Sequence, residues 1–185
     1  MKKAIGGSMF LAVGALAGIA SAMIGIDQAG TMSLAPGSPW QSWELSPASR
    51  AHPYVLAHYL MAGRLPPASG QMREFAAQRS DDGGVLTPVC TYLLVAKPAP
   101  GQWWSMATTS AGATDTGSNG VITADTAIAE TDGIVRLAVS RQPSGGNWVR
   151  APATGAFTLL YTLADASPGY AHPEIPAFSI DRSGC

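Results

Sequence analysis

The stretch "GGNWVRAPATGAFTLLYTL", Gly145–Leu163, carries the pattern that decides the fold class. Its paired glycines favour a tight turn, and the tryptophan that follows them is expected to be buried. A proline corner comes next, and the run Phe157–Leu163 has the aromatic and apolar character of a strand. The stretch therefore predicts a β-strand that the chain enters through a turn and a corner.

Short runs of the same kind cover the chain from Met72 onward. Reversals at 82–84, 132–133 and 144–146 separate them, because Asp-Gly and Gly-Gly pairs favour turns. The further expected strands are Arg73–Arg79, Thr87–Val95, Trp103–Thr109, Val121–Ala124, Ile134–Ser140 and Ile175–Ile180. Such spacing predicts a mainly-β domain of the sandwich or jelly-roll class.

One short helix is expected before these strands. Pro53 suits the first turn of a helix, and Tyr54–Ala62 is compatible with helix formation. Gly63 is placed to end the helix before Pro66. We expect this to be the only substantial helix outside the N-terminal segment.

The N-terminal segment has no charged residue between Ala4 and Ile26, which is long enough to cross a hydrocarbon core of about 30 Å. Lys2 and Lys3 precede it, and the positive-inside rule keeps them in the cytoplasm. The chain that follows is then delivered to the periplasm of a bacterium. The expected organisation is a cytoplasmic N-terminus at 1–3, a transmembrane helix at 4–26, an extended tether at 27–46 and a periplasmic β-domain at 47–185.

A cleaved signal peptide is the competing interpretation of this segment. Ala20-Ser21-Ala22 matches the small-residue pattern of a cleavage site. We favour a membrane anchor, because the apolar run continues past that site to Ile26. Cleavage after Ala22 stays open at this stage.

Small residues line one side of the expected anchor. Gly14 and Gly18 are four apart, and Ala22 continues the spacing, so all three share one helix face. Such a face lets a second helix approach closely, which predicts packing against an inner-membrane protein partner. The alternative is that glycine and alanine are simply common in membrane helices.

Two tryptophans, Trp40 and Trp43, interrupt the prolines and small polar residues of the expected tether. Tryptophan suits the lipid interface, where its amphipathic ring contacts both lipid and water. It also suits a position tucked under the β-domain. The sequence leaves both positions open.

The overall composition excludes partners chosen by bulk charge. Charged residues make up 12% of the chain and the formal net charge is −1, so no basic surface for nucleic acid is expected. The sequence also lacks a G-x-S-x-G elbow, a Walker loop and a dinucleotide fingerprint. We therefore expect no catalytic residues and no cofactor.

One string resembles a catalytic motif. Asp115-Thr116-Gly117-Ser118 matches the Asp-Thr-Gly-Ser signature of aspartic proteases, which need two carboxylates sharing one proton and thus a dimer. In those proteases an apolar strand leads into the motif, whereas "SAGAT" precedes it here. We expect a surface loop.

The three histidines do not predict a metal site. His52 and His58 are six apart and lie on different faces of one helix, while His172 lies in a proline-rich segment. A metal site would require all three to converge through tertiary folding. We expect no bound metal.

Three tryptophans, Trp103, Trp104 and Trp148, are candidates for contact with a partner or ligand, since the indole is a broad apolar platform with one donor. Adjacent strand residues point to opposite faces of a sheet. One of Trp103 and Trp104 is therefore expected to be buried and the other to remain available.

Four segments in order, "AHPYVLAHYLMAGRLP", "CTYLLVAKPAPGQWWSM", "NWVRAP" with "GAFTLLYTL", and "PEIPAFSIDRSGC", give the chain a family likeness. It resembles the short, membrane-anchored bacterial members of the DUF1214 family, which are related to the C-terminal domain of DUF1254/DUF1214 proteins. The resemblance implies a jelly-roll-like β-sandwich and brings no established activity. Where the family has an aromatic-Asp pair and an arginine, this chain has "MATTSAG", Leu160 and Tyr161.

The two cysteines, Cys90 and Cys185, are expected to form a disulfide. An even pair in a small β-domain is usually bridged in an oxidising compartment, and no C-x-x-C spacing indicates metal or redox chemistry. The bond would tie the last residue of the chain to a central strand.

Three classes of function are left open by the sequence. The first is a non-catalytic, membrane-anchored accessory subunit of an inner-membrane complex. The alternative is a periplasmic module that binds a small molecule or glycan, and the third is an anchored aspartic-type hydrolase. We favour them in that order, because the anchor has a face of small residues, the sequence has no recognisable catalytic set and the expected tether is short.

Overall fold

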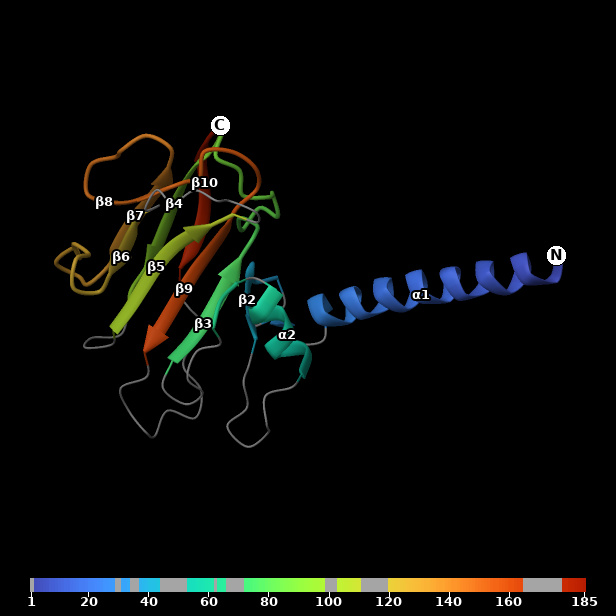
Figure 1. The fold of residues 1–185 in the computed structure, drawn as a ribbon. Helices are drawn as coiled ribbons and strands as arrows, with labels where there is room; N and C mark the ends of the chain where they lie inside the picture. The colour runs from blue at the N-terminus through green and yellow to red at the C-terminus, as the bar shows by residue number, and fades with distance from the viewer. Residues whose placement is uncertain are drawn as a thin grey trace. The chain divides into compact units, whose positions relative to one another are not determined.

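The computed structural model describes residues 2–28, 31–33, 37–43, 53–61, 63–65, 72–98, 103–110, 120–164 and 178–185. The chain divides into two compact units (Figure 1). The first comprises Met1–Thr31 and Glu44–Pro66 and contains both helices, and the second comprises Met32–Trp43 and Pro67–Cys185 and contains the β-sheets.

The helices are α1, Lys2–Gln28, and α2, Pro53–Met61. The strands are β1, Thr31–Ser33; β2, Trp40–Trp43; β3, Met72–Ala77; β4, Thr91–Ala96; β5, Trp103–Thr109; β6, Val121–Thr123; β7, Val135–Ser140; β8, Asn147–Arg150; β9, Thr158–Ala164; and β10, Ser179–Gly184.

The end of α2 follows the sequence pattern. Gly63 has a φ of 65°, a left-handed conformation that glycine adopts without steric cost. Its N–H donates to the Leu60 carbonyl at 3.0 Å, and the next N–H, that of Arg64, donates to the Tyr59 carbonyl at 2.9 Å. These bonds satisfy carbonyls that the helix end would otherwise leave open, so Gly63 terminates the helix as expected.

The strands form two sheets. The six-stranded sheet has the order β1-β2-β3-β9-β5-β6, and the four-stranded sheet has the order β10-β4-β7-β8. Neighbours such as β3 and β9, β5 and β9, and β4 and β7 are antiparallel, whereas β7 and β8 are parallel. The mainly-β class with two sheets is confirmed, while the jelly-roll connectivity stays a prediction.

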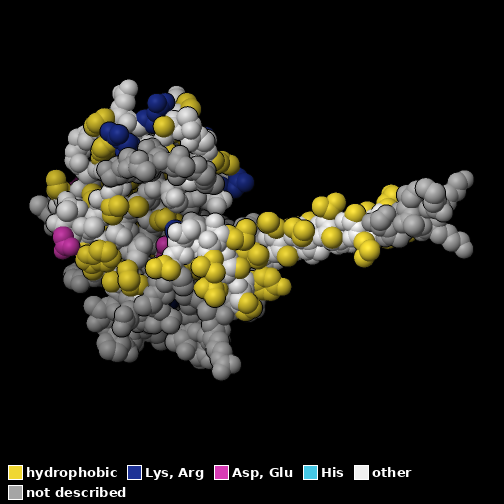
Figure 2. All heavy atoms as spheres, viewed as in Figure 1, with side chains coloured by type: hydrophobic (Ala, Val, Ile, Leu, Met, Phe, Trp, Pro, Cys, Tyr) yellow, Lys and Arg dark blue, Asp and Glu magenta, His cyan; other side chains and the backbone are white. Residues whose placement is uncertain are grey.

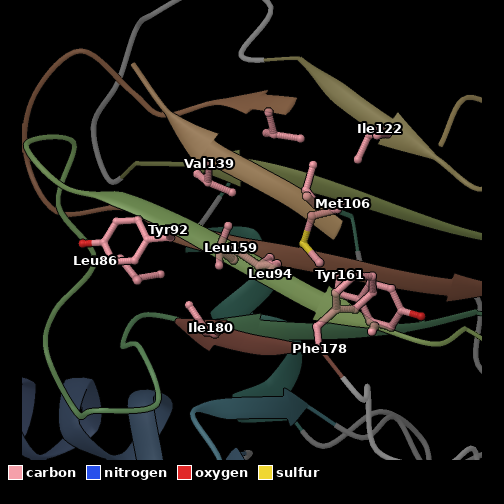
Figure 3. Close-up of a cluster of buried hydrophobic side chains, with 14 of the residues drawn as sticks. Leu86, Tyr92, Leu94, Met106, Ile122, Val139, Leu159, Tyr161, Phe178 and Ile180 are labelled. Carbon is pink, nitrogen blue, oxygen red and sulfur yellow. The ribbon is translucent and has the colours of Figure 1, made fainter. Parts of the chain in front are cut away.

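One hydrophobic core lies between the two sheets. Side chains alternate between buried and more exposed positions along β4, β5 and β9, as the period of two of a strand requires. Inward residues from both sheets form a single cluster (Figure 3). Its fully buried members include Tyr92, Leu94, Met106, Leu137, Leu159 and Ile180.

The opening stretch forms one more strand than the sequence predicts, because Asn147–Arg150 is β8. Val149 takes the buried position of this strand, so Trp148 is only half-buried rather than buried as expected. β8 runs parallel to β7, with Leu137 opposite Asn147. Residues 141–146 connect the end of β7 to the start of β8. This loop therefore runs back past only about three residues of β7, roughly 10 Å, a distance that a short loop spans.

Part of the expected tether belongs to the β-domain. α1 continues beyond Ile26 to Gln28, and Trp40–Trp43 pairs with β3 as strand β2. Trp40 is buried, and its Nε1–H donates to the Phe178 carbonyl at 2.8 Å. Burying this large ring holds the segment in the sheet. Residues 40–43 are therefore a strand of the β-domain and not part of the extended tether that the sequence predicts over 27–46.

Two strand boundaries differ from the sequence pattern for local reasons. β4 begins at Thr91 rather than Thr87, because residues 87–90 form a turn in which the Cys90 N–H donates to the Thr87 carbonyl at 3.2 Å. β10 starts at Ser179 and continues past Ile180 to Gly184 through its pairing with β4.

Candidate functional site

The helix α1 exposes an apolar surface along the described part of its length. Met9–Ile26 is long and apolar enough to cross a membrane, and none of it is buried. Figure 2 shows hydrophobic side chains along the described part of the helix. A signal sequence near an N-terminus meets the same criteria of length and hydropathy, so both interpretations apply to this helix.

The small-residue face of α1 is open over most of its length. A Cβ placed on Gly14 or Gly18 would have no other described atom within 4 Å. Ala22 is exposed, and Gly25 lies on the same face by its spacing. At Gly25 the added Cβ would lie 3.7 Å from Cε1 of Tyr54 in α2. One end of this face thus already accommodates a helix, and the stretch around Gly14 and Gly18 is uncovered.

The two adjacent tryptophans take opposite faces of β5, as expected. Trp104 is 3% exposed and packs edge-to-face on Phe178, with ring centroids 5.6 Å apart. Trp103 is 37% exposed, and its Nε1–H donates to Oδ2 of Asp125 at 3.1 Å. Of this pair, Trp103 is therefore the ring available to a ligand or partner.

Trp148 is held by its own neighbours. Its Nε1–H donates to the Ser140 hydroxyl at 3.0 Å, and the Arg150 guanidinium lies 5.6 Å from the ring centroid. Thr108 in β5 donates its hydroxyl to the Arg150 carbonyl at 2.7 Å, linking the two sheets. The cation–π contact covers part of the ring that a ligand would use.

Tyr161 lies at the centre of an aromatic cluster that sequence reasoning missed. The rings of Phe178, Phe75, Trp40 and Trp104 have centroids 5.2, 5.9, 6.2 and 6.2 Å from that of Tyr161. Figure 3 shows Tyr161 beside Phe178. Burial raises the pKa of Tyr161 to about 12, because the phenolate would lose its hydration among these rings.

We expect the Tyr161 pKa to appear as a loss of stability at alkaline pH. Below pH 10 the phenol is protonated in both states, whereas between about pH 10 and 12 only the unfolded state releases the proton. The free energy of unfolding should fall there by up to about 2–3 kcal/mol. Denaturant titrations of the wild type and Tyr161→Phe across this range test this, since the variant should lack the Tyr161 part of the loss. Equal alkaline losses in both proteins would contradict the assignment.

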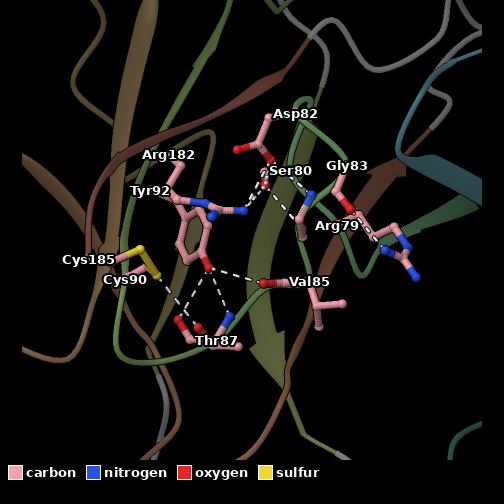
Figure 4. A network of polar contacts seen from close by, with 11 residues as sticks. Arg79, Ser80, Asp82, Gly83, Val85, Thr87, Cys90, Tyr92, Arg182 and Cys185 are labelled. Atoms are coloured by element: carbon pink, nitrogen blue, oxygen red, sulfur yellow. Dashed lines mark hydrogen bonds and ion pairs between the residues drawn. A yellow bond between two sulfur atoms is a disulfide. The ribbon is translucent and has the colours of Figure 1, made fainter.

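A polar network fixes β10 to the turn at 80–84 (Figure 4). The Ile180 N–H donates to Oδ2 of Asp81 at 2.8 Å, and the Arg182 guanidinium donates to Oδ1 of Asp82 at 3.2 Å. The buried Ser80 hydroxyl donates to the same Asp82 oxygen at 2.6 Å. Bonds from Ser80 and the Gly84 N–H, with the Arg182 charge, lower the pKa of Asp82. All these groups are engaged with one another, so the network acts as a fastening for the last strand.

The disulfide between Cys90 and Cys185 is present beside this network (Figure 4). The turn that carries Cys90 is ordered by Tyr92, whose hydroxyl accepts a hydrogen bond from the Thr87 N–H at 2.8 Å. Cys185 follows β10 directly and Cys90 precedes β4, so the bond closes the end of the antiparallel β4–β10 pair at which Gly184 lies opposite Thr91. The C-terminus is thus held by both covalent and polar contacts.

Several sequence hypotheses concern residues outside the described ranges. These are the Asp115–Ser118 string, His52, His172 and the side chain of Trp43. His58 is described, half-buried and edge-on to the Tyr59 ring at 5.7 Å. The protease-like motif and the three-histidine arrangement therefore stay untested.

The features that sequence reasoning missed had only faint signals. Asp82 was identified only as a turn residue and Asp81 not at all, although Arg182 and Ile180, about a hundred residues later, bind them. Tyr161 was noticed only as standing where the family-like pattern has an arginine. Long-range partners of this kind leave no local periodicity for a sequence pattern to report.

Comparison with known proteins identifies relatives by sequence and by fold. The family model of DUF1214, described as a protein of unknown function, matches residues 71–168. An uncharacterized protein from Burkholderia cenocepacia is 20% identical at a TM-score of 0.49, and the match covers 64% of this chain and 31% of that one. The VPA0106 protein from Vibrio parahaemolyticus is 17% identical at a TM-score of 0.51, covering 69% and 35%.

The chain thus spans about a third of the length of these two solved structures. At such identity, the likeness to the Vibrio protein indicates a shared fold and nothing further. No curated protein matches the chain.

Proposed function

The chain belongs to the DUF1214 family, a family of unknown function, and from that premise we propose that it is a non-catalytic accessory subunit of an inner-membrane complex, anchored by α1 with its β-domain in the periplasm. The observation that carries the proposal is the uncovered apolar surface of α1. Exposing so many apolar side chains to water is unfavourable by about 25 cal/mol for each Å². A bilayer or a second membrane helix removes that cost.

The proposed orientation is supported by two independent features. Lys2 and Lys3 precede the apolar stretch, and basic residues favour the cytoplasmic side. The Cys90–Cys185 disulfide suits the other side, because disulfides persist in oxidising compartments such as the periplasm. Together they favour an α1 that crosses the inner membrane with its C-terminal end outward.

The proposed contact with a protein partner is supported by the open face around Gly14 and Gly18. Lipid tails are as apolar as the side chains of a helix, so helices in a membrane associate through close backbone packing. Glycine permits that approach, and the same face already receives Tyr54 at Gly25. A partner helix would complete the face toward the N-terminus.

A second candidate function, binding of a small molecule or glycan, is favoured by Trp103. Its half-exposed ring is held in one orientation by the bond to Asp125, which suits a stacking platform. Solubilisation in mild detergent followed by native gels and mass spectrometry separates the two functions. A stable co-migrating protein complex supports the accessory subunit, and its absence favours the binding module.

The contact face is tested by enlarging it. The double variant Gly14→Leu with Gly18→Leu should remain in the membrane fraction, because lipid solvates a bulky helix as readily as a smooth one. It should disappear from the co-migrating complex, because leucine side chains keep the two backbones apart. Native gels followed by immunodetection measure both outcomes.

The matched control enlarges the opposite face of α1. Ala12 and Ala20 lie about half a turn from Gly14 and Gly18, so Ala12→Leu with Ala20→Leu adds similar bulk without touching the small-residue face. This control should keep the complex. Full association of the glycine variant, or equal loss in both variants, would contradict a specific contact at Gly14 and Gly18.

A further inference from the structure

The helix α2 exposes apolar side chains where a soluble helix exposes polar ones. Val55 and Tyr59, one turn apart, are buried and mark its inward side. No Asp, Glu, Lys or Arg occurs in the helix. The exposed large side chains on its other sides are Tyr54, Leu56, Leu60 and Met61. A helix that is apolar all round is normally surrounded by protein or lipid.

The apolar surface continues just beyond the helix. Leu65 is 86% exposed, two residues after Gly63 turns the chain. Between them, the Arg64 guanidinium lies 5.5 Å from the centroid of the Tyr59 ring. Leu60, Met61 and Leu65 are thus exposed apolar residues that are close in sequence to the positive charge of Arg64, a combination that suits the boundary between lipid tails and headgroups.

The position of α2 within its unit indicates what covers this surface. Tyr54, in the first turn of α2, contacts α1 at Gly25, one residue before the apolar stretch Met9–Ile26 ends. Where α1 crosses a bilayer, this end of the stretch lies at the membrane surface. Figure 2 shows hydrophobic side chains where Figure 1 places α2 as well as along α1. The first turn of α2 therefore adjoins the lipid-facing surface of α1, and the other exposed apolar side chains of α2 follow along the helix from there.

We propose that α2 is an interfacial membrane helix whose exposed side chains Leu56, Leu60, Met61 and Leu65 insert into the outer leaflet of the bilayer that α1 crosses. The occupant of this surface is the lipid bilayer, because α2 begins beside the membrane helix and its described exposed large side chains are apolar, with the Arg64 charge at one end. The inference rests on the proposed function in requiring that α1 spans the membrane. Interfacial helices of this kind bury their apolar face about 5–10 Å deep.

Spin labels at single introduced cysteines measure the depth of α2 directly. Both native cysteines are in the disulfide, so an introduced thiol is labelled alone. The full chain carrying L60C is reconstituted into vesicles of phosphatidylethanolamine and phosphatidylglycerol. The accessibility of the label to oxygen, which concentrates in lipid, is compared with its accessibility to a water-soluble nickel chelate. Leu60 is 60% exposed, so the label does not disturb the fold.

Two matched variants calibrate the depth scale. L16C places the label in the apolar stretch of α1, and I128C places it on an exposed apolar residue of the β-unit. We expect L16C to report the bilayer interior, I128C to report water, and L60C to report a depth just below the headgroups. Leu60 and Ile128 are similarly exposed and apolar, so hydrophobicity alone does not separate them.

Each other outcome overturns a different statement. L16C in the bilayer with L60C as accessible to the chelate as I128C overturns the interfacial helix and leaves the anchor standing. L16C accessible to the chelate overturns the proposed function and the inference with it. A label at L60C screened from both reagents shows a protein contact on α2, which also overturns lipid as the occupant.

Discussion

Reduction of the Cys90–Cys185 disulfide is expected to lower the free energy of unfolding by about 4 kcal/mol. The two cysteines are separated by 95 residues, and the bond closes a loop of that length in the unfolded chain. In the chain-entropy model such a loop corresponds to about 4–5 kcal/mol, with native strain reducing the value. The loss arises mainly in the unfolded state, because β10 keeps its pairing with β4 and its bonds to Asp81 and Asp82.

Thermal unfolding of the full chain in detergent micelles, with and without reductant, measures this effect. For a chain of this size the melting temperature should fall by roughly 8–16 °C. The control is the double variant Cys90→Ala with Cys185→Ala, which should melt at the lower temperature and show no response to reductant. If the melting temperature is unchanged after both thiols have been shown to be free, the disulfide does not contribute to the stability of the fold.

Much of the β-domain was predictable because its signals are local. The run Phe157–Leu163 was expected as a strand, and its inward residues Leu159, Tyr161 and Leu163 are indeed buried in β9. The adjacent Trp103 and Trp104 had to face opposite sides of a strand, and they do. Alternation and turn chemistry act between near neighbours, so they can be identified before any tertiary contact is known.

The missed strands depend on contacts that are distant in sequence. Asn147–Arg150 is too short to show alternation, and it becomes a strand because β7 lies beside it. The segment around Trp40 is polar apart from its tryptophans, and it joins the sheet through β3 and Phe178. In both cases tertiary pairing overrides a weak local preference.

The candidate membrane surface was predictable only in part. The spacing of Gly14, Gly18 and Ala22 identifies a helix face from the sequence. The sequence also shows that α2 is rich in apolar residues, but burial inside the domain explains such a helix equally well. Only the exposed positions of Leu60 and Met61, with the contact between Tyr54 and Gly25, distinguish a lipid-facing helix from a core helix.

Replacement of the buried Trp40 is expected to be the most damaging single substitution outside the disulfide. Trp40→Ala empties a position that is 1% exposed, next to Tyr161, and removes the donor that the Phe178 carbonyl uses. Truncation of a buried tryptophan costs about 3–5 kcal/mol. The midpoint of denaturant unfolding of the full chain in micelles measures the loss.

Two further variants show which part of the Trp40 side chain is responsible. Trp40→Phe keeps an aromatic ring against Tyr161 but leaves the Phe178 carbonyl without its donor, so it should lose about 1–3 kcal/mol. Trp103→Ala removes a half-exposed ring on the face of β5 that points away from the core. Its free energy of unfolding should fall by less than about 1 kcal/mol. If Trp40→Ala and Trp103→Ala were equally stable, residues 40–43 would not contribute to the core, and the segment would be the tether that the sequence pattern predicts.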